Sequence, residues 1–340
     1  MITTIHLFGY SNFFSSEGIS ISNKVFVGII EAVNQIGING FVFISAYYMS
    51  WRGSRTNLKK LVAFIIELHF LSVLILLISA VLGGSISLSN IVKSVFPILT
   101  QHYWYPFSYI LLLIFSPYIN VMLNSFTKHQ IGQFLGLMLL TCCCFIKINI
   151  FYSSDVYLGH HSHSIIWFFI LYVSAFYYRH YGLPFCNWKI FLCSVLLMFM
   201  LTMAGPYLSR FENLELLDYD ALLSWAATYS GFSLFCELHM RWLQKDVIVK
   251  TIKHISKATF VVYIFQEHDA VRTTLWSKVN ILQYVDAPVY KIALLTFLLF
   301  GALLLISLGI MWIYSLAYKA YINRIVNVAE QRILIFMKRK

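Results

Sequence analysis

Charged side chains are scarce in this chain of 340 residues: Asp, Glu, Lys and Arg make up 11% of it, whereas apolar residues make up 59%. With a mean hydropathy of +0.74, the chain has too little polar surface to solvate a water-soluble domain of this size. Long polar stretches are also missing, since no soluble domain longer than the loop 239–257 fits between the apolar segments. These absences exclude a soluble protein and indicate an integral membrane domain.

Acidic residues are few, 14 against 25 lysines and arginines, and the formal net charge is +11. An excess of base can indicate nucleic-acid binding, but these bases lie beside apolar segments and are not gathered in one block. We therefore expect no nucleic-acid partner. We predict instead that the bases orient the chain and contact anionic lipid headgroups.

The six cysteines form no disulfide framework, because they lie in or beside apolar segments: Cys142, Cys143, Cys144, Cys186, Cys193 and Cys236. Three adjacent cysteines of a helix cannot converge on one metal ion, since successive side chains point about 100° apart. We interpret the six as buried free thiols. Internal repeats, low-complexity tracts and a secretory signal peptide are also lacking.

Apolar segments long enough to cross a bilayer, about 20 residues each, recur along the chain. They lie near 25–50, 61–82, 103–124, 131–150, 164–181, 188–206, 219–239, 258–275 and 289–318. The segment 258–275 is the weakest, because polar residues crowd its second half, and a half-helix that meets a polar cavity would accommodate them. We predict an all-α, polytopic transmembrane bundle of about nine to ten spans. The membrane domain would cover 1–318, and 319–340 would be a basic cytoplasmic tail.

Basic and base-poor segments alternate between these spans, and this alternation predicts the orientation. The basic segments hold Arg52, Arg55, Lys59 and Lys60, then Lys128, then Arg179 and Lys189, then Arg241, Lys245, Lys250, Lys253 and Lys257, and finally the tail. Lysine and arginine near span ends stay in the cytoplasm. The tail should therefore be cytoplasmic, as an amphipathic helix on the inner surface of the membrane.

The predicted orientation implies that residues 1–14 belong to a spanning helix. If 51–60 lies inside, the span at 25–50 runs from outside to inside, so another segment must cross before it. Only 1–14 precedes it, and this stretch makes about half of a spanning helix. We therefore expect the chain to begin inside its first span, which would be truncated.

Ionisable groups inside apolar spans are costly, and by default they indicate function. His6 lies among apolar neighbours in TTIHLFGY and could act as a general base, since histidine as a residue type is the usual general base at neutral pH. It could equally be a histidine that bonds to the backbone of a neighbouring helix. Glu31 and Asn39 mark the polar side of the next segment.

Two later clusters are rich in aromatic or polar residues. In 101–120, Tyr103 and Trp104 form an aromatic group at the external end of a span, which suits an interfacial anchor. In 255–279, Tyr263, Gln266 and Arg272 would share a face if one helix continued through them. The adjacent residues 267–269 point in different directions, so we predict no metal site. The external run HHSHS at 160–164 is interpreted as a solvated loop.

Four blocks in the same order and spacing resemble the acyltransferase 3 family of bacterial integral membrane proteins, especially its surface-polysaccharide O-acetyltransferases. They are IGINGFVFISAYYM (36–49), HYWYPFSYILLLIFSPYINVML (102–123), SIIWFFILYVSAFYYRHY (164–181) and ISKATFVVYIFQEHDAVRTTLW (255–276). The resemblance implies transfer of an acetyl group from cytoplasmic acetyl-CoA to a sugar hydroxyl of an envelope or capsular polysaccharide, or of its lipid-linked precursor. It also implies a multi-pass protein of the bacterial inner membrane.

The resemblance also implies site residues. The family has a histidine in its first span, which His6 matches, and often an arginine upstream, which would fall before Met1. Ala46 stands where the family usually has glycine. Gln266 replaces the first histidine of the late block, and His268 matches the second.

Acetyl transfer needs a base near the acceptor oxygen, and His6 is the candidate for this role. It also needs hydrogen-bond donors for the thioester oxyanion, for which Asn39, Tyr263 or Arg272 are candidates. The donor's phosphates need cytoplasmic cations, and acceptor sugars need aromatic surfaces. We assign the cations to Arg52, Arg55, Lys59 and Lys60, and the surfaces to Tyr103 and Trp104. The expected partners are the bilayer, acetyl-CoA as the donor substrate, and a glycan or lipid-linked sugar, with no other cofactor.

Two other classes of protein also have many spans. A glycan polymerase or flippase shares the external aromatic residues, but polymerases usually carry one large external loop, and the longest external segment here has about twenty residues. A small-molecule transporter would favour internally related halves, and the sequence has none.

Overall fold

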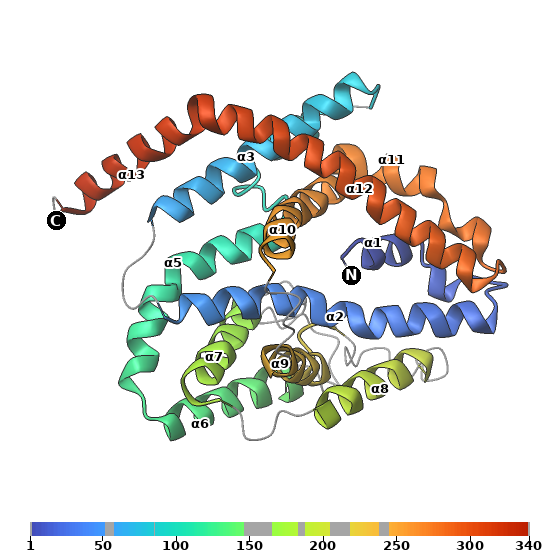
Figure 1. The fold of residues 1–340 in the computed structure, drawn as a ribbon, viewed down its shortest axis with the longest axis horizontal. Helices are drawn as coiled ribbons and strands as arrows, with labels where there is room; N and C mark the ends of the chain where they lie inside the picture. Colours follow the sequence, from blue (N-terminus) through green and yellow to red (C-terminus); the bar gives the residue numbers. More distant parts are fainter. Residues whose placement is uncertain are drawn as a thin grey trace. The chain divides into compact units, whose positions relative to one another are not determined.

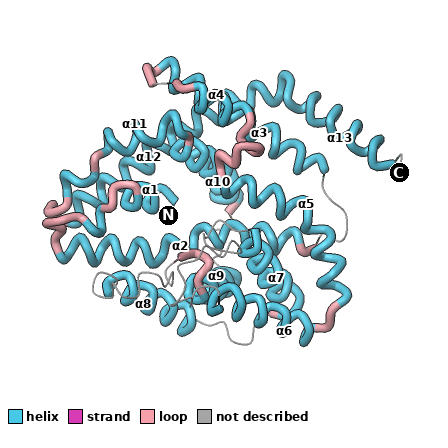
Figure 2. Tube along the Cα trace, turned by 180° about the vertical axis from the view of Figure 1, so that it is seen from behind, coloured by secondary structure: helices cyan, strands magenta, loops and turns pink. Residues whose placement is uncertain are grey.

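The computed structural model describes residues 2–51, 58–84, 86–145, 165–182, 188–204, 218–237 and 245–338. Within these ranges every regular element is a helix, and no strand is drawn (Figures 1 and 2). The prediction of an all-α fold is confirmed.

The α-helices lie at the apolar segments of the sequence and at some of the connections between them. They are α1 (Ile2–Gly9), α2 (Ile21–Met49), α3 (Leu58–Val81), α4 (Leu88–Val95), α5 (Trp104–Ser125), α6 (Lys128–Leu139), α7 (Ile165–Tyr181), α8 (Trp188–Ala204), α9 (Leu222–Glu237), α10 (Asp246–Glu267), α11 (Asp269–Val279), α12 (Val289–Ala317) and α13 (Asn323–Lys338). π-Helical turns at Leu140–Phe145 and Tyr318–Ile322 extend α6 and join α12 to α13. Short 3-10 turns lie at Phe13–Ser15 and Ile281–Tyr284.

Four helical stretches of the described chain are long and apolar enough to cross a membrane: Ile21–Met49, Leu58–Val81, Trp104–Ser125 and Val289–Ile333. Trp188–Ala204 is a shorter apolar helix. Spans of this length satisfy their backbone hydrogen bonds internally, which a bilayer requires.

Helix α5 shows how a span tolerates a proline. Pro117 lies inside the helix and has no backbone N–H, so it cannot donate to the carbonyl of Leu113 one turn earlier. The hydroxyl of Ser116 donates to that carbonyl instead, at 3.1 Å. The neighbouring serine thus supplies the hydrogen bond that the proline removes, which keeps α5 continuous through the apolar layer.

The helices form two compact units that alternate along the chain. The first unit comprises residues 1–55, 111–239 and 281–291. In it, α2 packs against α1, α7, α8 and α9, while α6 packs against α7. The start of α2 is hydrogen-bonded to the segment 281–291. The Asn23 amide donates to the carbonyls of Val285 (2.9 Å) and Ala287 (2.8 Å).

The second unit comprises residues 56–110, 240–280 and 292–340. Its central element is α3, which packs against α4, α10, α11 and α13. The hydroxyl of Ser79, at the end of α3, donates to the carbonyl of Ala270 in α11 at 3.0 Å. The polar junction between α10 and α11 is therefore held against a long apolar helix.

Candidate functional site

In the first unit, His6 lies on the short helix α1. Leu7 and Phe8, the next two residues, are buried, and the hydroxyl of Thr4 donates to the Asn34 amide of α2 at 2.7 Å. His6 itself is half-buried, and its ring centroid lies 5.4 Å from that of Tyr10. The packing of α1 against α2 thus fixes the backbone that carries the predicted base.

Asn39, a predicted oxyanion donor, is fully buried on α2, and both ends of its amide are engaged. Its nitrogen donates to the carbonyl of Tyr219 at 2.6 Å, and its oxygen accepts from the Trp167 indole of α7 at 2.8 Å. A carboxamide with two buried partners holds helices in register. In this structure Asn39 ties α2 to α7 and to the segment before α9.

A second buried carboxamide repeats this arrangement and joins α5 to α2 and α7. Asn120 of α5 donates to the carbonyl of Met49 at 3.1 Å and accepts from the hydroxyl of Tyr172 at 2.8 Å. Spacing along the chain does not reveal these contacts, since Asn120 lies 71 positions after Met49 and 52 before Tyr172.

The predicted donor-binding bases are only partly within the described residues. Lys59 and Lys60 lie in the first turn of α3, and both are exposed. Arg52 and Arg55 lie outside the described residues.

In the second unit, the polar residues of the late block surround a break between two helices. α10 ends at Glu267, His268 is extended (φ −64°, ψ 125°), and α11 begins at Asp269. Tyr263 and Gln266 belong to α10 and Arg272 to α11, so the condition under which all three would share one helical face is not met. That condition was a continuous helix, whereas His268 leaves the helical conformation and caps the next helix.

The hydrogen bonds of His268 fix the tautomer of its buried ring. Its Nδ1 accepts from the backbone N–H of Ala270 at 3.1 Å, so the proton of the neutral ring belongs on Nε2. Nε2 lies 2.9 Å from the hydroxyl of Ser94 and 3.2 Å from the carbonyl of Ser72. The Ser94 hydroxyl donates in turn to the Asn90 carbonyl at 2.7 Å. This arrangement excludes His268 as a base for Ser94 and makes it an N-cap for α11.

Asp269, the first residue of α11, is the centre of a charged cluster. Lys93 contacts it at 2.7 Å and Arg272 at 3.2 Å, and Arg272 also lies 3.9 Å from Glu267. A carboxylate in the first turn is further stabilised by the helix dipole. The side chain of His102 is 2% exposed, with Nδ1 3.8 Å from Asp269. Burial lowers the pKa of His102, so its ring is neutral at pH 7.

Aromatic rings lie beside this charged cluster. Tyr103 is buried, and its ring centroid lies 6.4 Å from that of His268 and 6.5 Å from that of Tyr263. Trp104 lies edge-on to Tyr105 at 5.7 Å. Gln266 is fully buried, and neither atom of its amide has a hydrogen-bond partner among the described residues. The unit thus combines aromatic surfaces with polar groups, which suits recognition of a polar ligand.

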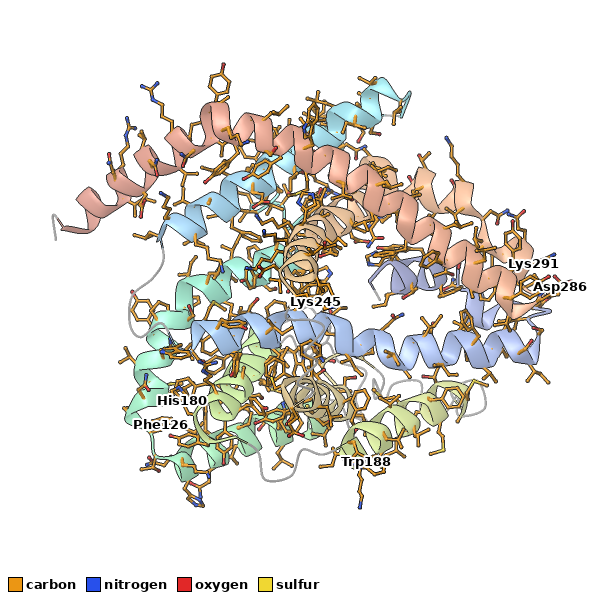
Figure 3. The ribbon with its side chains drawn as sticks, in the orientation of Figure 1. Phe126, His180, Trp188, Lys245, Asp286 and Lys291 are labelled. Carbon is orange, nitrogen blue, oxygen red and sulfur yellow. The ribbon has the colours of Figure 1, made fainter. Side chains whose placement is uncertain are left out.

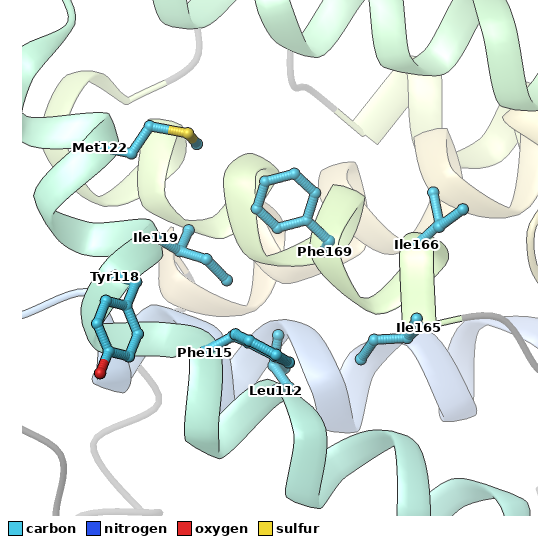
Figure 4. Close-up of a pocket in the computed structure, with 8 residues that line it drawn as sticks. All are labelled: Leu112, Phe115, Tyr118, Ile119, Met122, Ile165, Ile166 and Phe169. Carbon is cyan, nitrogen blue, oxygen red and sulfur yellow. The ribbon is translucent and has the colours of Figure 1, made fainter.

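An apolar groove of about 380 Å³ lies in the first unit, between α5 and α7 (Figure 4). Its walls carry the side chains of Leu112, Phe115, Tyr118, Ile119, Met122, Ile165, Ile166 and Phe169. Apart from the hydroxyl of Tyr118 these side chains are apolar, so the groove can accept hydrocarbon.

The comparison with protein families decides the class of the chain. A model of the acyltransferase 3 family, described as an acyltransferase domain, matches residues 1–316. The chain belongs to the acyltransferase 3 family. No curated protein and no solved structure matches the sequence. Together with its long apolar helices, the match makes this a multi-pass membrane acyltransferase.

Within this acyltransferase, the structure brings together Tyr103, Tyr263, His268 and Arg272 of the predicted substrate-binding set. It adds three residues that sequence reasoning missed as site members: Lys93, Ser94 and His102. Lys93 carried a weak signal, since it is the only lysine or arginine in 83–102. Its partner Asp269 lies 176 positions away, which no local pattern reveals.

Proposed function

We propose that this acyltransferase moves an acetyl group from cytoplasmic acetyl-CoA to a sugar hydroxyl of an envelope or capsular polysaccharide, or of its lipid-linked precursor. The observation that carries the proposal is His6, an imidazole held in an apolar helix of a chain whose family transfers acyl groups. The resemblance of the four blocks to polysaccharide O-acetyltransferases supports the choice of acceptor.

In the reaction, His6 accepts the proton of the sugar hydroxyl as its oxygen attacks the thioester carbonyl. The C–O bond forms, and the negative charge on the carbonyl oxygen is stabilised by hydrogen-bond donors, a role that we assign to Tyr263 or Arg272. When the intermediate collapses, the C–S bond breaks and the coenzyme A thiolate receives the proton from the imidazolium. The products are the acetylated sugar and coenzyme A.

The proposal includes the arrangement of the chain in the inner membrane. It has about nine to ten spans, with the basic segments and the C-terminus in the cytoplasm. Arg52, Arg55, Lys59 and Lys60 then face the donor's phosphates. Segments 83–102 and 267–287 lie outside, so the cluster around Asp269, with Tyr103, Trp104 and His268, belongs to the acceptor side.

Substitution of His6 tests the function. His6→Ala should abolish acetylation of the glycan while the amount of protein in the membrane stays unchanged, because it removes the base. His69→Ala is the matched control. His69 is also a histidine within an apolar helix, and its Nδ1 lies 2.7 Å from the Ile65 carbonyl of its own helix, as expected for a structural residue.

Acetyl esters on purified glycan would be quantified by mass spectrometry. Loss of acetylation in His6→Ala alone supports the proposal. Acetylation near the wild-type level in His6→Ala would make His6 a packing residue and overturn its catalytic role.

A further inference from the structure

The guanidinium of Arg179, near the end of α7, lies over two aromatic rings of the first unit. Its guanidinium carbon lies 4.2 Å from the ring centroid of Tyr47 and 4.0 Å from that of Trp51. Tyr47 belongs to the last turn of α2, and Trp51 follows that helix. His180, the next residue, is labelled in Figure 3 at the end of α7. These two aromatic neighbours hold the guanidinium near the end of α7.

Stacking covers the faces of a guanidinium but leaves the N–H groups at its edge available for hydrogen bonds in the plane. Arg179 is half-buried, and among the described residues it has neither an ion pair nor a hydrogen bond. A charge that is partly removed from water and has no counter-ion is costly, so the chain gains if an anion binds there. A planar fork of this kind matches a phosphate group.

The surroundings of Arg179 favour an anion of nucleotide type. Trp51 directly precedes the basic segment that holds Arg52 and Arg55. Its indole is 74% exposed, so part of the ring stays accessible for stacking on a base. A guanidinium suits a phosphate and an exposed indole suits a base, so the two together suit an adenine nucleotide.

From this geometry we infer that Arg179 binds a phosphate of the nucleotide half of the acetyl-CoA donor, and that Trp51 stacks on its adenine. The inference rests on the proposed function, and it adds a binding element on α7 to the four bases expected from the sequence. Other interpretations are that Arg179 binds the phosphate of an anionic lipid headgroup or only anchors α7 to α2.

Binding of coenzyme A to the purified full chain, reconstituted in nanodiscs of zwitterionic lipid, tests the inference. Arg179→Gln should weaken binding roughly ten- to a hundredfold, because it removes a charge-assisted contact to phosphate. Arg179→Lys keeps the charge but loses the planar fork, so it should recover only part of the affinity. Pantetheine, which has no phosphate, should bind equally to all variants.

Lys128→Gln is the matched control for loss of charge. Lys128 is exposed at the start of α6, and its Nζ lies 5.6 Å from the ring centroid of Tyr181, in the last turn of α7. We expect this variant to bind coenzyme A as the wild type does. Trp51→Leu changes an exposed side chain and should also weaken binding, which gives a second test if Arg179→Gln fails to fold.

The possible results are distinguishable. Equal coenzyme A affinity of the wild type, Arg179→Gln and Trp51→Leu would overturn the inference and leave the proposed function intact. A wild-type chain that binds no coenzyme A would overturn both. In nanodiscs with phosphatidylglycerol, loss of lipid binding but not of coenzyme A binding in Arg179→Gln would assign Arg179 to the lipid headgroup and overturn the inference.

Discussion

The bridge made by Asn39 can be tested by its removal. Asn39→Ala deprives the Trp167 indole of its acceptor and the Tyr219 carbonyl of one donor, at positions where the amide is fully buried. Loss of one partner of a buried hydrogen bond costs about 1–3 kcal/mol. With two such bonds, the free energy of unfolding should fall by roughly 2–6 kcal/mol if the costs add.

Asn34 provides a matched control on the same helix. It is 2% exposed, accepts one hydrogen bond from the Thr4 hydroxyl, and its amide nitrogen has no partner in the described part of the chain. Asn34→Ala frees a hydroxyl that can rotate and removes an unpaired amide. Its cost should therefore stay below about 1 kcal/mol.

Thermal unfolding of both variants in the same detergent would measure the difference. Asn39→Ala should unfold well below Asn34→Ala, and Trp167→Phe should fall between them because it breaks only one of the two bonds. Equal midpoints for Asn39→Ala and Asn34→Ala would refute the bridge. Loss of acetyl transfer at an unchanged midpoint would favour the oxyanion role predicted for Asn39.

Two further predictions concern the helix cap and the orientation. His268→Ala should lower the free energy of unfolding by about 1–2 kcal/mol, because α11 loses its cap, and His268→Asn should restore part of it; equal thermal stability of all three proteins would contradict the cap. Reporter fusions at 54, 128, 185, 250 and 340 should report the cytoplasm and those at 88, 156 and 213 the outside; two or more reversed sites would refute the orientation.

The sequence was sufficient to place most helices, because a spanning helix needs an apolar run of nearly fixed length. It failed at the boundary between α10 and α11. Histidine is not a usual N-cap, so nothing local marked His268 as the residue that ends one helix and begins the next. The polar residues Glu267, His268 and Asp269, which follow Gln266, did mark the region as unusual for a membrane span.

The residue pairs that hold each unit together could not be predicted from spacing. Asn39 and Trp167 lie 128 positions apart and meet only because α2 packs against α7. Lys93 is the only lysine or arginine in 83–102, and nothing around it in the sequence points to Asp269, against which the fold places it. Patterns of hydrophobicity specify which side of a helix is buried, but they carry no information about which helix covers it.

The contact of Asn23 with Val285 and Ala287 constrains how the protein can be made. The partners lie 262 and 264 positions after Asn23, so the ribosome must synthesise most of the chain before either carbonyl exists. Until then the amide at the start of α2 has neither acceptor. Helix α2, the earliest long helix of the chain, therefore gains these two hydrogen bonds only late in translation. In a partly synthesised chain, the start of this helix is held less firmly than in the completed protein.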